Sequence, residues 1–149
     1  MNKLFVFFLL VTFQAFSQSK KECINVMTSY VKNYNTPEYS FDFVDDKLNP
    51  TLTKVQTIVC KTKDKELLEK FLEMILKTSG SANEHPADVF GQIFICNPEI
   101  VEEQLKGKFK NEIIFDNLKL GFLNNTFDWP ASDKKKSLQN RMNKLINQK

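Results

Sequence analysis

Apolar side chains recur every three or four residues along most of this chain, and this spacing restricts most of it to helices. The clearest stripe lies in residues 64–78 and consists of Leu67, Leu68, Phe71, Leu72, Ile75 and Leu76. Lys and Glu fill the gaps, as expected for a helix with one buried face. The same period predicts further helices at residues 20–34, 50–61, 85–96, 98–106, 108–124 and 132–147.

Asn or Thr precedes proline at three places, Thr36-Pro37, Asn49-Pro50 and Asn97-Pro98. Asn and Thr side chains accept hydrogen bonds from the free N–H groups at a helix start, and proline suits the first helical position. These pairs therefore predict helix starts.

Residues 38–46 depart from the helical period, because Tyr39, Phe41 and Phe43 alternate with polar residues as in a strand. No other segment alternates in this way, so a strand here would have no partner. We predict instead a short helical turn or an extended connector whose aromatic side chains pack on the helices. The predicted fold class is all-α, with six or seven short helices stacked as antiparallel hairpins.

One internal similarity points to a repeat. The pattern Asn49-Pro50-x-Leu52-x-x-x-Gln56 recurs 48 residues later as Asn97-Pro98-x-Ile100-x-x-x-Gln104. HEAT and armadillo arrays repeat a helix pair at a period close to this. The similarity favours a degenerate HEAT-like array over a four-helix bundle.

Residues 1–17 have the three parts of a secretory signal peptide. Lys3 gives the positive start, Leu4 to Phe13 form the apolar run, and Ala15 and Ser17 occupy the small-residue positions of a cleavage site. The run is too short for a retained membrane anchor, which needs about 20 apolar residues. The residues before Cys23 are too polar for a lipoprotein signal. We expect residues 18–149 to form a single helical domain that is periplasmic or extracellular, with no membrane span.

Charge gives no support for nucleic-acid binding. Without Lys3 the 21 basic residues fall to 20, against 18 acidic ones. Arg141 is the only arginine, whereas arginine is the side chain best suited to two-point contacts with phosphates and bases. We predict no nucleic-acid partner.

Three cysteines in an oxidising compartment predict one disulfide and one remaining thiol. Cys23 begins a predicted helix, while Cys60 and Cys96 each end one, so all three would gather at one end of antiparallel helices. Both Cys60–Cys96 and Cys23–Cys60 are consistent with this arrangement, and we favour the first. No C-x-x-C pair is present, and the sequence predicts no cofactor and no metal site.

Catalytic patterns are sparse. His85 is the only histidine, and the chain has no H-E-x-x-H, G-x-S-x-G or S-x-x-K sequence. Paired carboxylates remain the one route to hydrolysis, through Asp42, Asp45 or Glu102. This gives the alternative function, a cell-envelope hydrolase.

The favoured function is binding without catalysis. An exported helical protein of this size, with no catalytic set, is interpreted as a macromolecule-binding protein, most concretely an inhibitor or immunity-type protein whose partner is another protein. The expected interaction surface consists of Tyr39, Phe41, Asp42, Asp45 and Trp129. A third interpretation, a chaperone-like or membrane-surface protein, would use the lysines at 134–136.

Overall fold

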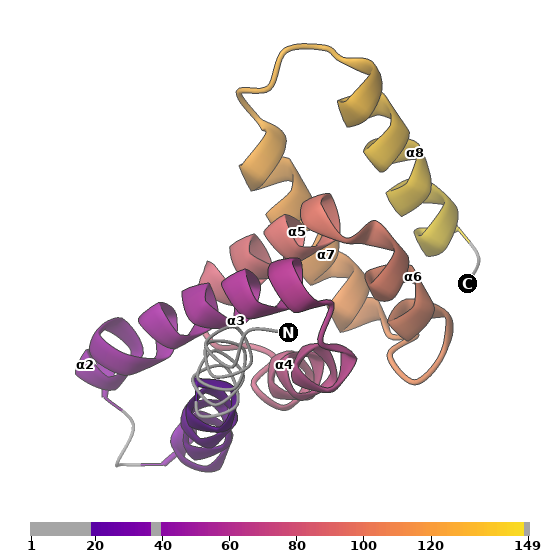
Figure 1. The fold of residues 1–149 in the computed structure, drawn as a ribbon. Helices are drawn as coiled ribbons and strands as arrows, with labels where there is room; N and C mark the ends of the chain where they lie inside the picture. Colours follow the sequence, from indigo (N-terminus) through magenta and orange to yellow (C-terminus); the bar gives the residue numbers. More distant parts are fainter. Residues whose placement is uncertain (1–18, 37–39, 148–149) are drawn as a thin grey trace, which may run out of the picture.

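The computed structural model describes residues 19–36 and 40–147, and within them the chain is helical and has no strand (Figure 1). This confirms the predicted all-α class with six or seven helices. Residues 19–33 form the first described helix. The helices that follow are α2 (Phe41–Phe43), α3 (Asn49–Thr62), α4 (Lys65–Lys77), α5 (His85–Cys96), α6 (Pro98–Lys106), α7 (Glu112–Thr126) and α8 (Asp133–Ile146). The predicted signal peptide lies outside the described residues.

Side-chain caps begin four of these helices, and in α2 the Ser40 hydroxyl accepts from the Phe43 N–H. Asp64 accepts a hydrogen bond from the Leu67 backbone N–H at 3.0 Å, and Ser132 caps α8 in the same way. Asn111 caps α7 by accepting from the Ile113 N–H. The predicted start of this helix at residue 108 was therefore four residues early. The chain first makes a turn after α6, in which the Phe109 N–H bonds to the Gln104 carbonyl.

The predicted helix start at Asn49-Pro50 matches the first residues of α3, but Asn49 does not cap this helix. A π-helical segment, Val44–Leu48, joins α2 to α3 without a break, so Pro50 lies inside a continuous helix. Proline lacks the N–H of a regular helical bond, and its ring collides with the carbonyl four residues before it. The wider π turn, in which the Asn49 N–H bonds to the Val44 carbonyl, lies directly before this proline.

The alternating segment at residues 38–46 is helical from Phe41 onward, which agrees with the helical alternative. The predicted packing of its aromatic side chains is only partly correct. Phe43 packs against the core, but Phe41 is 73% exposed. Tyr39 lies outside the described residues.

Asn97 starts α6, as predicted, but its side chain does not cap that helix. Its amide nitrogen donates instead to the Val59 and Cys60 carbonyls, at 3.1 and 3.0 Å. Both carbonyls lie at the C-terminal end of α3, where the Val59 carbonyl also accepts from the Lys63 N–H and the Cys60 carbonyl has no partner within the helix. The buried Asn97 side chain therefore joins the start of α6 to the end of α3.

The core is built around α5, which contacts α3, α6 and α7. Phe90 of α5 packs edge-on against Phe71 of α4, with ring centres 6.2 Å apart. Phe94 packs in the same way against Phe122 of α7, at 6.0 Å. The buried set extends from Cys23 in the first helix to the apolar side of α8.

Helices α3 and α5 run side by side in the same direction. The Asn83 amide, just before α5, donates to the Asn49 side chain at the start of α3. At the other end, a disulfide joins Cys60 to Cys96, with their Cα atoms 5.7 Å apart. Of the two pairings that the sequence leaves open, the structure has this one. Cys23 is free and buried, and burial raises the pKa of its thiol.

The last helix, α8, lies over α6 and α7 (Figure 1). Its Arg141 binds two carboxylates of α6, Glu102 at 2.5 Å and Glu99 at 2.9 Å. The hydrogen bond to Glu102 is the main cause of a raised pKa at Arg141. The only arginine of the chain therefore holds two helices together.

Candidate binding surfaces

The predicted interaction surface is divided between two places in the structure, since Trp129 lies apart from Phe41, Asp42 and Asp45. Phe41, Asp42 and Asp45 are exposed on α2 and the π segment. Trp129 lies in the connection between α7 and α8, at the opposite end of the molecule from α2 (Figure 1). It is partly buried and packs against the core. Tyr39 lies outside the described residues.

The carboxylates of the hydrolase alternative also lie on separate elements. Glu102 of α6 is occupied by its bond to Arg141. Asp42 and Asp45 face solvent, and none of the three lines the hollows described below. Among the described residues, no group of three His, Cys, Asp or Glu side chains is placed to hold a metal ion.

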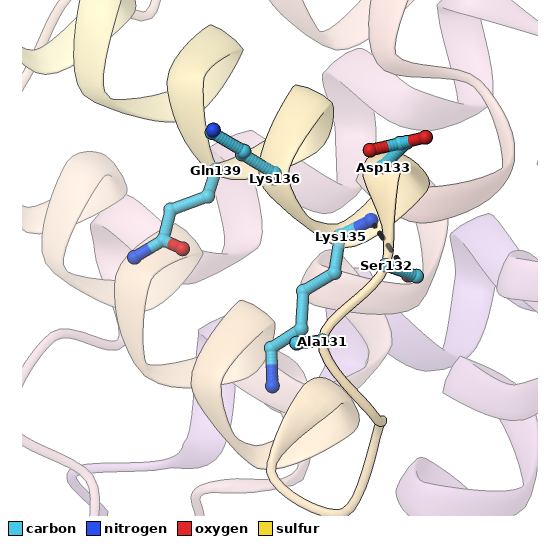
Figure 2. Close-up of a pocket in the computed structure, with 6 residues that line it drawn as sticks. All are labelled: Ala131, Ser132, Asp133, Lys135, Lys136 and Gln139. Carbon is cyan, nitrogen blue, oxygen red and sulfur yellow. Dashed lines mark hydrogen bonds between the residues drawn. The ribbon is translucent and has the colours of Figure 1, made fainter.

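A first hollow, of about 470 Å³, lies at the start of α8 and is lined by Ala131, Ser132, Asp133, Lys135, Lys136 and Gln139. Figure 2 shows Lys135 and Gln139 extending to one side of α8, while Lys136 and Asp133 extend away from them. The dashed line in the figure is the helix cap, in which the Lys135 backbone N–H donates to the Ser132 hydroxyl.

The ammonium of Lys135 has a structural role. It donates to the Thr126 carbonyl at 2.7 Å and to the Trp129 carbonyl at 3.2 Å. It thereby bonds to carbonyls at and just after the C-terminal end of α7. A positive charge is also favourable there, because this end of a helix carries the negative end of its dipole. Lys134 lies 5.5 Å from the centre of the Trp129 ring. Two of the three lysines that the membrane-surface interpretation would use are therefore engaged within the protein.

Helix α7 is apolar on two sides. One side is buried against α5 and the core through Ile114, Phe115, Leu118, Gly121 and Phe122. The other side, which we call the outer face of α7, exposes Ile113, Leu120, Leu123 and Phe127. Leu123 is 60% exposed and Phe127 is 76% exposed. An exposed row of large apolar side chains is typical of an interaction site.

Sequence reasoning missed this face because the helix predicted at 108–124 was not divided into a buried and an exposed side, and its range stopped before Phe127. The signal was present as spacing. Ile113, Leu120 and Phe127 follow one another at intervals of seven, which places them along one side of a helix. This side is not the one that carries Ile114 and Leu118.

A second hollow, of about 460 Å³, lies between α3, α5 and α7. We call it the carboxamide hollow. It is lined by Gln56, His85, Asp88, Val89, Gln92, Asn124 and Asn125. Asn124 donates to the Asp88 carboxylate at 2.8 Å, and the Asn125 amide nitrogen donates to the Asp88 and Gly121 carbonyls. Gln92 donates to the Asn125 side-chain oxygen. These bonds hold the lining in place.

No helix of the described residues is long and apolar enough to cross a bilayer. The surface disulfide, with Cys96 exposed, is compatible with an oxidising location outside the cytoplasm. Comparison of the chain with protein-family models, curated proteins and solved structures gives no match.

Proposed function

We propose that this is an exported protein that acts by binding another protein, without catalysis, through the outer face of α7. An inhibitor or immunity-type role is the most concrete form of this proposal. The observation that carries it is the exposure of Leu120, Leu123 and Phe127 on a helix whose opposite side is fully packed. Large apolar side chains that gather on an exposed face are typical of an interaction site.

Energetics support the choice of this face. Burying apolar surface contributes about 25 cal/mol per Å², and a large aromatic side chain buries about 150–250 Å². Leu123 of α7 and Phe127, the residue directly after this helix, lie four positions apart in helical geometry, so one partner surface can cover both. Such a cluster has the composition of an interface centre, with polar groups at its edge.

Photo-crosslinking tests the binding face. A benzoylphenylalanine at position 127 should give one discrete adduct with an exported protein in the native host. The same group at position 32, an exposed site on the first described helix, is the matched control. Leu123→Ser should reduce the adduct from position 127. No adduct at 127, or the same adduct from both positions, would contradict the proposal.

The inhibitor role has its own test. The crosslinked partner, once identified, should be a toxin or a cell-wall hydrolase whose activity falls when the purified protein is added. If the partner's activity does not change, the protein binds this partner without inhibiting it, and the inhibitor role is rejected.

Export is tested by mass. Protein recovered from outside the cytoplasm should begin at Gln18, since cleavage is expected after Ser17. Protein that keeps Met1 and stays in the cytoplasm would overturn the exported location.

A further inference from the structure

We propose that the carboxamide hollow receives an arginine side chain of the protein partner. This inference rests on the proposed function, because the hollow adjoins the outer face of α7. Asn124 belongs to the hollow, and its neighbours on the helix surface include Leu120, four residues before it, and Phe127, three residues after it.

The hydrogen bonds within the lining leave several side-chain oxygens free, and one of them belongs to the charged carboxylate of Asp88. Asn125 uses its amide nitrogen on two carbonyls and its oxygen on Gln92. Asn124 and Gln92 each donate from nitrogen, which leaves their side-chain oxygens without a hydrogen bond in the described part of the chain. Asp88 accepts through one carboxylate oxygen and keeps the other.

These acceptors are matched by a guanidinium group. Arginine carries five N–H donors in a planar fork and no acceptor. Its fork can meet Asp88 and the oxygens of Gln92 and Asn124 together, whereas lysine offers a single point charge. Asp88 gives the hollow a negative charge, which complements the cation. Gln56 lies on the α3 wall, and its side chain, which has no hydrogen bond within residues 19–36 and 40–147, offers a further oxygen.

The walls of the hollow are held rigidly. Helices α5 and α7 meet in backbone contact at Gly91 and Gly121, and α3 is fixed to α5 by the disulfide at residues 60 and 96. A site that is already formed loses little entropy when it is filled. Arginine is also among the side chains that contribute most at protein interfaces.

Amide spectra of the whole protein test this inference. The probes are N-acetyl-arginine amide, N-acetyl-lysine amide and N-acetyl-citrulline amide, which has nearly the shape of arginine but no charge. The arginine probe should shift the side-chain NH₂ signals of Gln56, Gln92 and Asn124 in a saturable way. Binding of the citrulline probe should be at least about tenfold weaker, since it loses the charge-assisted bonds. Equal shifts with all three probes, or none with arginine, would overturn the inference.

Two matched variants complete the test. Asp88→Asn keeps the size of the side chain and should weaken the arginine probe about tenfold or more. Asp46→Asn removes an exposed carboxylate of the π segment, away from the hollow and from α7, and should leave binding of the arginine probe unchanged. In the crosslinking experiment, an adduct that needs Leu123 but is unaffected by Asp88→Asn would reject the arginine site and keep the proposed function. If the adduct persists unchanged in both Leu123→Ser and Asp88→Asn, the proposed function itself is rejected.

Discussion

Gly91 of α5 and Gly121 of α7 lie against each other where the two helices cross. A Cβ atom added to Gly91 would come within 2.7 Å of the Phe122 backbone nitrogen, and one added to Gly121 within 2.9 Å of the Gly91 nitrogen. Both neighbours are backbone atoms, which cannot rotate away as a side chain does. The close approach of α5 and α7 therefore requires glycine at both positions.

Gly121→Ala should lower the free energy of unfolding by about 3 kcal/mol or more, because the new methyl group overpacks the crossing. Urea denaturation measures the loss. Lys119→Ala, an exposed change two residues away on the same helix, should stay within about 0.5 kcal/mol of the parent. Equal effects of the two changes would show that the crossing tolerates a side chain.

Removing the disulfide should destabilise the protein. The double variant Cys60→Ala/Cys96→Ala frees a loop spanning 36 positions, and loop entropy predicts a loss of about 3–4 kcal/mol. Denaturant unfolding with and without dithiothreitol measures it. The reductant should destabilise the parent and leave the double variant unchanged. A parent that is insensitive to the reductant would contradict the contribution of the disulfide.

Asn97→Ala should cost about 1–3 kcal/mol, since it removes the donor of two buried carbonyls at the end of α3. Thermal unfolding followed by circular dichroism detects the change. Asn143→Ala, at an exposed site of α8, is the control and should have little effect. Asn97→Asp should be at least as harmful, because a carboxylate cannot donate; full stability in this variant would rule out a donor role.

Acid should weaken the attachment of the first described helix to α4. Burial alone would raise the pKa of Asp64, but the Lys20 ammonium and the Leu67 N–H outweigh it and hold this pKa below the ordinary value. A carboxylate with a lower pKa in the folded state binds fewer protons there. Its stabilisation is present above the unfolded value of about 3.9 and is lost as pH falls through the folded value.

Asp64→Asn isolates this effect, because asparagine still caps a helix but does not titrate. The free energy of unfolding of the parent should fall more steeply between pH 6 and pH 3 than that of Asp64→Asn. The other acidic groups are common to both proteins. Parallel curves would show that Asp64 has the same pKa in both states.

The outer face of α7 should contribute little to folding. Phe127→Ser should change the free energy of unfolding by no more than about 0.5 kcal/mol, since this side chain faces solvent. Phe122→Ala, on the packed side of the same helix, should cost about 3–5 kcal/mol. Thermal and urea unfolding separate the two. A large loss in Phe127→Ser would assign this face to the core.

Periodicity alone was enough to predict the helical class and most helix positions. Helix α4 illustrates why, because its apolar stripe from Leu67 to Ile75 matches the buried side and Asp64 marks its start. The apolar spacing and the capping residue both lie within the helix or directly before it, so they can be read from the local sequence alone. Predictions were less accurate where a contact with a distant residue decides the outcome.

Asn49 and Asn97 show this difference. Both precede proline, and the sequence predicts the same role for both. In the structure Asn49 lies within a continuous helix and bonds to Asn83, while Asn97 bonds to the end of α3. The repeat was inferred from the similarity of these two positions, and their local structures differ. The degenerate HEAT-like array and its antiparallel hairpins therefore remain predictions. The carboxamide hollow could not be predicted, since it takes residues from three helices whose arrangement is not local.

The disulfide changes what a protease can do to this protein. Between its two cysteines lies the connection from α4 to α5, at residues 78–84, where Ser79 and Gly80 are exposed. A cut there would leave both pieces covalently joined, so they would migrate as one band until reduced. The cut ends would also stay at high effective concentration relative to each other. A nicked molecule would thus keep α3 beside α5, and the carboxamide hollow between them and α7 would keep its walls.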